Sequence, residues 1–139
     1  MKKGTVYLII FIGLGLLFFG TPLLVKNNTS NTAIVLDLFN PFVKNTEVYV
    51  KTTEEFVTTY KSAGEEVSNN ENKQEGLNYV YVTASYNDKG RKRNLKYVSF
   101  GKKLTPNKYL KITNKGQDVR KWEEVSEEEV PKKALEKLN

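Results

Sequence analysis

The sequence contains no cysteine and no histidine among its 139 residues. Without cysteine the chain forms no disulfide, and it offers neither a thiolate nucleophile nor a thiolate metal ligand. Without histidine it lacks the commonest metal ligand and the commonest general base of enzymes. Since no catalytic or cofactor motif stands out elsewhere, we expect a protein that is not an enzyme, with no catalytic residue, no cofactor and no metal site.

Charged residues are missing from one long stretch near the N-terminus. Residues 6–25, VYLIIFIGLGLLFFGTPLLV, consist mainly of aliphatic and aromatic side chains. A helix of this length extends about 30 Å, which is the thickness of the hydrocarbon core of a bilayer. It also pairs its own backbone groups, as lipid requires. We therefore expect one transmembrane helix in an N-terminal segment covering residues 1–26.

The charges on either side of this run predict its orientation. Lys2 and Lys3 precede it, whereas Lys26 is the only charge close behind it. The positive-inside rule then places the N-terminus in the cytoplasm and the rest of the chain outside the cell membrane. The length of the run and the poor fit of its end to a signal peptidase site favour a retained anchor. The alternative is a signal sequence whose removal releases a secreted protein.

Residues 27–46 are predicted to form a spacer with a short apolar helix. Thr32 would cap a helix over residues 33–39, and Asn40-Pro41 would end it, because a residue before proline avoids the helical region. The helix could pack on the domain that follows, or it could lie on the outer leaflet as an interfacial helix. Asp37 is its only charge and no basic residues flank it. This composition favours docking on the domain.

Residues 47–139 are enough for one small domain, and their pattern is that of β-strands. Alternating β-branched and aromatic residues predict five strands, at 47–53, 77–86, 93–100, 108–114 and 118–125. The polar residues 64–76 are predicted to form a long mobile loop. Gly90 and Gly116 lie in predicted turns between strands. We expect a mainly β fold, an OB-fold-like antiparallel barrel of five strands with a short C-terminal helix.

Four residues near the C-terminus are expected to have structural roles: Trp122, Pro131, Leu135 and Leu138. Trp122 is predicted to be a core residue that faces the terminal helix. Ser126 and Glu129 have the spacing of a capping box, and Pro131 suits the first position of a helix that runs to residue 138. Leu135 and Leu138 share one side of that helix, so they are expected to pack on the end of the barrel.

Several short motifs along the chain resemble those of a known family. In order, they are DLFNPF at 37–42, VYVKT at 48–52, YNDKG at 86–90, YLKI at 109–112, WEEV at 122–125 and VPKKALEKL at 130–138. Together they resemble the YxeA-like family of small exported or membrane-anchored proteins of Gram-positive bacteria. The resemblance implies an OB-fold-like barrel and an extracytoplasmic location, and it implies no function because the family is uncharacterised.

The net charge is +6, and the positive charge is concentrated in the second half of the chain. Between Lys89 and Lys121 the only acid is Asp118. Seven basic residues of this segment are candidates for a patch that binds an anionic partner: Arg91, Arg93, Lys96, Lys102, Lys103, Lys108 and Lys111. The partner would be an anionic envelope polymer or lipid headgroups. The alternative is an ordinary solvated face, since lysine is common at exposed strand positions.

These features favour a non-catalytic binding or accessory module held at the cell envelope. One alternative is binding of single-stranded nucleic acid, because OB-folds combine basic grooves with aromatic residues that stack on bases. Tyr81, Tyr97 and Tyr109 lie near lysines in the sequence. The expected location outside the membrane argues against this partner, and the tyrosines are then expected to pack at the rims of the barrel.

The second alternative is an enzyme that uses the glutamates at positions 123, 124 and 127–129 as paired carboxylates, as glycosidases do. Clustered glutamates beside the start of a helix usually compensate its dipole instead. Ser126 has no histidine to activate it as a nucleophile. We therefore expect no catalysis here.

Overall fold

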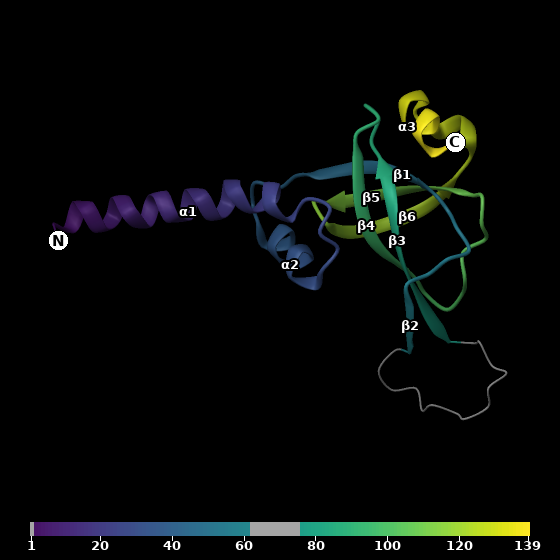
Figure 1. Ribbon diagram of the computed structural model, residues 1–139, viewed down its shortest axis with the longest axis horizontal. Coiled ribbons are helices and arrows are strands. Elements are labelled where there is room, and N and C mark those ends of the chain that lie inside the picture. Colours follow the sequence, from purple (N-terminus) through teal and green to yellow (C-terminus); the bar gives the residue numbers. More distant parts are fainter. Residues whose placement is uncertain (1, 62–75) are drawn as a thin grey trace.

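The structure is a computed structural model that describes residues 2–61 and 76–139. Its elements are α1 (Lys3–Val25), α2 (Asn31–Phe39), β1 (Asn45–Lys51), β2 (Thr58–Lys61), β3 (Leu77–Tyr86), β4 (Lys92–Ser99), β5 (Tyr109–Lys115), β6 (Asp118–Val125), the 3-10 turn η1 (Glu127–Glu129) and α3 (Lys132–Leu138). Figure 1 shows α1 projecting from a strongly curled antiparallel sheet, with α3 at the far side. The predicted mainly β, barrel-like fold with an N-terminal apolar helix and a short C-terminal helix is confirmed.

The prediction of five strands is wrong by one, because it misses β2. This strand has the sequence TTYK and pairs antiparallel with the start of β3, from Thr58 opposite Val80 to Lys61 opposite Leu77. A short polar strand lacks the apolar alternation that makes the other five recognisable. The predicted mobile loop at 64–76 lies, except for Gly76, outside the described residues.

The core of the sheet is rich in tyrosine. The sheet has the order β2-β3-β1-β5-β6, and β4 pairs with the other edge of β3. Its curled inner face buries Val48, Val50, Tyr79, Tyr81, Leu95, Tyr97, Leu110 and Ile112. The rings of Tyr81 and Tyr97 stack with centroids 5.6 Å apart, and the Tyr81 hydroxyl accepts a hydrogen bond from the amide of Leu104. These two tyrosines are therefore core residues, and the prediction that they pack at the rims is wrong.

Helix α3 covers the opposite face of the sheet. Ala134 is fully buried there against Tyr49 and Tyr109, and Leu135 and Leu138 pack around them as predicted. The capping box of Ser126 and Glu129 is present, and Pro131 is the N-cap of α3, one position before the first helical residue. Trp122 packs in the core inside the sheet and not in the cluster under α3, so the prediction that it faces this helix is wrong.

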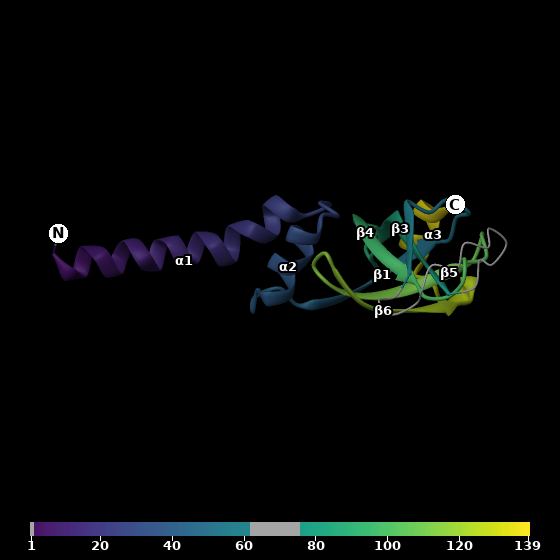
Figure 2. The ribbon, with the colours of Figure 1, turned by 90° about the horizontal axis from the view of Figure 1, so that it is seen from below.

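Helix α1 is long and apolar enough to cross a membrane, and most of its side chains are exposed, with only Val25 fully buried. Its only charged residue is Lys3, at the first position. Figures 1 and 2 show it extending away from the sheet, with α2 beside its last turns. A free-standing helix of this composition has no protein core to cover it, so its apolar surface needs another apolar environment.

Helix α2 is docked on the domain, which confirms the predicted docking. It begins at Asn31, and its N-cap is Ser30 and not Thr32, because the Ser30 hydroxyl accepts from the amide of Ala33. Ala33 and Asp37 are buried on the side that faces the sheet. The ammonium of Lys115, at the end of β5, donates to the carbonyl of Leu38 at 2.6 Å. Residues 27–44 are therefore part of the folded unit and not a free spacer.

A buried glutamine connects both helices to the sheet. The Gln117 amide donates to Asp37 Oδ2 at 2.7 Å, and its side-chain Nε2 donates to the carbonyls of Asn28 and Asn94. Its Oε1 accepts from Arg93 at 2.8 Å and from the amide of Asn27 at 3.4 Å. We call Asn27, Asn28, Asp37, Arg93, Asn94 and Gln117 the Gln117 network. Every donor and acceptor of the Gln117 side chain is used in it.

Gly116 allows the β5–β6 turn to approach Asp37 closely. Its φ is +59°, a conformation that residues with a Cβ rarely adopt, and a Cβ built on it would overlap the carboxylate of Asp37. Burial lowers the pKa of the Arg93 guanidinium, while the neighbouring charge of Asp37 acts to raise it. The joint between α2 and the sheet thus consists of the turn at Gly116, the buried Asp37 and Arg93.

Candidate functional site

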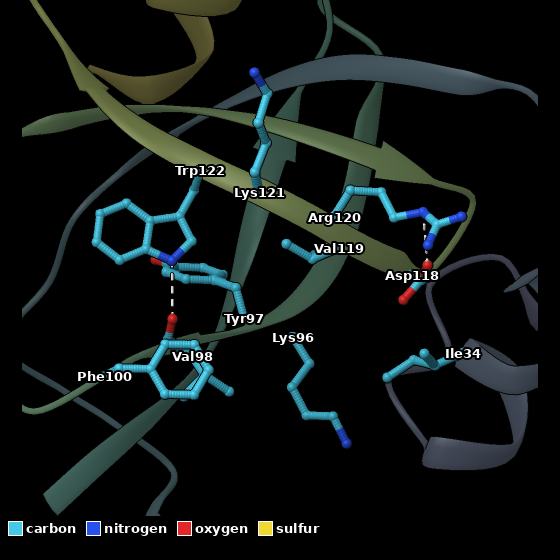
Figure 3. Close-up of a pocket in the computed structure, with 10 residues that line it drawn as sticks. All are labelled: Ile34, Lys96, Tyr97, Val98, Phe100, Asp118, Val119, Arg120, Lys121 and Trp122. Carbon is cyan, nitrogen blue, oxygen red and sulfur yellow. Dashed lines mark hydrogen bonds and ion pairs between the residues drawn. The ribbon is translucent and has the colours of Figure 1, made fainter.

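The curled sheet leaves an open seam between its edges at β4 and β6. In the described part of the chain these two strands share no backbone ladder. They are joined instead by a side chain: the indole Nε1 of Trp122 on β6 donates to the carbonyl of Val98 on β4 at 2.8 Å. Figure 3 shows this bond crossing the seam. The barrel is therefore closed on this side by one tryptophan and not by hydrogen-bonded strands.

A groove of about 450 Å³ follows the seam. Tyr97, Val119 and Trp122 line its inner part, and the exposed ring of Phe100 stands at one end. Ile34 of α2 lines the other end. The groove thus has an apolar and partly aromatic surface and ends beside the helix that packs on α1. Surfaces of this kind accommodate rings or chains of a ligand, with nearby polar groups fixing its position.

Basic side chains border the groove. Lys96 reaches toward α2, where its ammonium donates to Asn31 Oδ1 at 2.6 Å, and among the described residues no carboxylate pairs with it. Arg120 Nε lies 3.1 Å from Asp118 Oδ2, so its charge is partly balanced. Lys121 also lines the groove, and the end of its side chain extends away from it in Figure 3. The charge on the rim is therefore positive and comes mainly from Lys96.

The seven residues of the predicted basic patch lie in different surroundings. Arg91 is exposed near the β3–β4 turn, and Arg93 belongs to the Gln117 network. Lys102 and Lys103 lie in the β4–β5 loop, where the Lys103 ammonium is 4.8 Å from the centre of the Phe56 ring. On β5 and just before it, Lys111 pairs with Glu47 at 3.1 Å and Lys108 with Glu124 at 3.6 Å. Of the seven, only Lys96 lines the groove.

The other residues that the sequence offered as candidates for binding or catalysis have structural roles. Tyr81, Tyr97 and Tyr109 are buried, so their rings are not free to stack on bases. Within the capping box, the bond from the Ser126 amide lowers the pKa of Glu129, and the Ser126 hydroxyl, which donates to Glu129 at 3.0 Å, lowers it further. In the described ranges, no group of three or more acidic residues is placed to hold a metal ion.

Comparison with known proteins identifies the family. Residues 41–128 match the family described as "Protein of unknown function (DUF1093)". The chain belongs to this family. The "Uncharacterized protein YxeA" of Bacillus subtilis (strain 168) is 33% identical to it over 104 residues, which cover 75% of this chain and 76% of that protein. The resemblance to YxeA-like proteins found in the sequence is therefore confirmed.

A solved DUF1093 structure has the same fold. The crystal structure of a DUF1093 family protein from Bacillus subtilis is similar with a TM-score of 0.50 and 32% sequence identity, covering 73% of this chain and 98% of that one. The matched DUF1093 region begins at Pro41 and therefore includes the whole sheet and its seam, but not α1 or α2. Neither comparison assigns an activity, so the function has to be argued from the groove and the helices.

Phe100 and Arg120 of this DUF1093 protein line the groove but are absent from the predicted patch. The sequence offers a weak signal for Phe100, an aromatic residue directly before a glycine at the end of a predicted strand. Arg120 lies within the basic segment, at the shift in register between β5 and β6. Neither feature predicts that β4 and β6 face each other, because β4 pairs with β3 and β6 pairs with β5.

The buried hydroxyl of Tyr97, a core residue that also lines the groove, makes stability sensitive to high pH. Burial raises its pKa from 10.0 to about 12. Between these values the unfolded chain loses the phenol proton while the folded protein keeps it, so stability falls as pH rises from 10 to 12. The expected loss approaches about 1.4 kcal/mol per pH unit and reaches on the order of 2 kcal/mol at pH 11.5. Urea unfolding of the full-length protein in detergent from pH 8 to 11.5 measures it.

The Tyr97→Phe variant is the matched control for this titration. It keeps the ring stacked on Tyr81 and removes only the titrating group. We expect its stability to fall less steeply than that of the wild type above pH 10, with a difference below about 1 kcal/mol at pH 8. Parallel pH profiles for the two proteins would contradict a buried, titrating Tyr97.

Proposed function

We propose that this protein is a membrane-anchored, non-catalytic binding module on the outer side of the cell membrane, and that the seam groove binds an anionic polymer of the envelope. The observation that carries the proposal is the open seam itself. It presents an apolar, partly aromatic surface beside the ammonium of Lys96, which no carboxylate of the described residues neutralises, on a domain attached to a lipid-compatible helix. A polymer that alternates short carbon units with anionic groups matches these two features.

Retention of the N-terminal helix is part of the proposal, and the fold supports it. Val25 at the end of α1 is buried, and the chain just behind it is bonded to Gln117 and Asn94 on the sheet. Cleavage in this region would remove partners of the Gln117 network. The charges of Lys2 and Lys3 ahead of α1 favour a cytoplasmic N-terminus, which places the groove outside.

The mass and location of the protein in Bacillus cells test the anchor. We expect to find the protein in the membrane fraction with its full-length mass. We also expect protease added to intact protoplasts to degrade the folded domain that contains the sheet. A shortened mature form in the medium would instead establish the secreted alternative.

A binding titration tests the groove. Full-length protein in nanodiscs of zwitterionic lipid is titrated with poly(glycerol phosphate), and the single tryptophan, which lines the groove, reports binding by fluorescence. We expect Lys96→Glu to weaken binding about tenfold, since reversing one charge at a direct contact costs on the order of 1.4 kcal/mol. Phe100→Ala is expected to weaken it less.

Lys92→Glu is the matched control, because Lys92 is an exposed residue of the same strand as Lys96 and does not line the groove. It makes the same change in net charge, and we expect affinity within about twofold of wild type. Equal losses for Lys96→Glu and Lys92→Glu would show general charge attraction and reject the groove as the site. Absence of binding in the wild type would reject the anionic polymer.

A further inference from the structure

The side of α2 that faces away from the sheet is apolar and exposed. Phe39 is 77% exposed and Phe42, just after the helix, is 56% exposed, with Val35 and Leu36 also exposed nearby. We call these four residues the α2 corner. They are exposed beside α1 itself, whose apolar side chains form a continuous surface with them. Such a concentration of large apolar side chains marks a contact surface.

The corner is fixed against α1 by aromatic contacts. The Phe42 ring lies 4.7 Å from that of Phe19 and 5.8 Å from that of Phe18, between ring centroids. The two residues on α1 lie well inside the helix, several residues before its end at Val25. Seven residues of helix correspond to about 10 Å, so the corner reaches back along α1 by roughly this distance.

A hydrogen bond made possible by a proline fixes the same position. Pro22 has no amide hydrogen, so it leaves the carbonyl of Phe18 without its helical partner four residues ahead. The side-chain amide of Asn40, which is buried, donates to this carbonyl at 2.7 Å. An unpaired carbonyl is costly in lipid, and this bond satisfies it from α2. The contact between the corner and the middle of α1 is therefore specific.

The length of α1 then determines the depth of the corner. The charge of Lys3 marks the inner end of the apolar part of α1, and residues 3–17, which separate it from Phe18, extend about 22 Å. A hydrocarbon core of about 30 Å needs several more residues of α1, roughly as far as Leu23. Phe18 and Phe19 must then lie about 6 Å inside the outer boundary of the hydrocarbon. Phe42 contacts both rings, so it lies at the same depth.

We infer that the α2 corner is inserted in the outer leaflet as a second membrane contact, with lipid acyl chains as its partner. The inference rests on α1 spanning the membrane, as in the proposed function. The depth agrees with that of interfacial amphipathic helices, which are buried about 5–10 Å. The opposite side of α2 meets the sheet through Ala33 and Asp37. The domain therefore lies directly on the bilayer in one orientation, with the seam groove near the headgroups.

The absence of cysteine allows a direct test by single-cysteine labelling. Full-length Phe39→Cys protein is labelled with an environment-sensitive fluorophore and reconstituted in phosphatidylcholine–phosphatidylglycerol vesicles. Quenching is measured with nitroxide-labelled lipid and with aqueous iodide. Leu14→Cys in the middle of α1 reports on the anchor, and Val57→Cys, which is exposed just ahead of β2, is the aqueous control. Phe42→Cys provides a second position at the corner.

We expect lipid nitroxide to quench positions 14, 39 and 42 at least three times more than position 57, and iodide to show the reverse order. If position 14 is quenched by lipid while positions 39 and 42 are quenched by iodide, the α2 corner is not inserted and the inference is wrong, although the anchor stands. If position 14 is also quenched by iodide, the membrane anchor itself fails. Protection of positions 39 and 42 from both quenchers would show a protein partner or a second copy and would also overturn the inference.

Discussion

The Trp122→Ala variant is expected to lose about 3 kcal/mol of stability, with a melting temperature at least 10 °C below that of the wild type. Two losses add in this variant. The indole packs on the core cluster inside the sheet, and its Nε1–H is the hydrogen bond that links β6 to β4 at the carbonyl of Val98. The expected loss lies at the lower end of the range for tryptophan because the ring is partly exposed. Thermal and urea unfolding of the full-length protein in detergent measure it.

Two control variants separate packing from seam closure. Trp122→Phe keeps most of the apolar contact and removes the bond to Val98, so a loss of about 1–2 kcal/mol is expected. Lys121→Ala, the neighbouring residue on the same strand, has an exposed side chain and is expected to stay within about 0.5 kcal/mol of the wild type. A Trp122→Ala melting temperature within a degree or two of the wild type would contradict the role of Trp122 in closing the seam.

The strands with clear alternation were predictable from the sequence because their limits are fixed by local chemistry. Strands β3 and β6 have the predicted limits and helix α3 has the predicted end, since turns with Gly90 and Gly116 or the capping box of Ser126 and Glu129 bound these elements. Strand β2 was missed because its residues are polar and its pairing with β3 is its main support. Pairing at an edge leaves no periodic pattern in the strand itself.

The sequence did not reveal which face of the sheet is the core. On β3, both faces have apolar side chains, so period-two alternation is compatible with either choice. The structure buries Tyr79 and Tyr81 inside and exposes Val82. Tyr81 is tolerated there because its hydroxyl has a backbone partner at Leu104. The hypothesis of base-stacking tyrosines failed for this reason, since a local pattern does not distinguish an exposed aromatic face from a tyrosine-lined core.

The sequence also did not predict which basic residues lie close together in space. Lys96 was grouped with Lys108 and Lys111 in one predicted patch because the three residues are close in the chain. In the sheet, however, β4 and β5 are separated by β3 and β1. The partners of Lys108 and Lys111 come from β6 and β1, and they balance the charge of both lysines locally. Only the closure of the sheet brings Lys96 near Arg120 and Trp122 across the seam.

One signal for the joint between α2 and the sheet was present in the sequence. Asp37 is a single charged residue in an apolar helix, and a buried carboxylate requires partners from elsewhere in the fold. The sequence does not say where they come from, because Gln117 is eighty residues away in a segment that has the composition of an ordinary turn. The partnership depends on the turn reaching α2, which Gly116 permits.

The Gln117→Ala variant is expected to lose about 3 kcal/mol and to loosen the helices from the sheet. Truncation leaves the carbonyls of Asn28 and Asn94 and the guanidinium of Arg93 without their partner in a partly buried site. Each unsatisfied buried group costs about 1–3 kcal/mol, partly recovered by water that enters the space. Urea unfolding measures the loss, and spin labels at Val35→Cys and Val57→Cys measure the position of α2 relative to the sheet.

Gln117→Met separates the hydrogen bonds from the volume of the side chain. It fills nearly the same space without the amide, so we expect it to lose almost as much stability as Gln117→Ala and to broaden the distance distribution between the labels. The tryptophan fluorescence of Trp122 should stay native in both variants, because the core cluster does not include Gln117. A narrow distance distribution with unchanged stability would mean that the remaining contacts, such as that of Lys115 with Leu38, hold the joint alone. Since the orientation of the domain on the bilayer depends on this joint, the same variants should also reduce the lipid quenching at position 39.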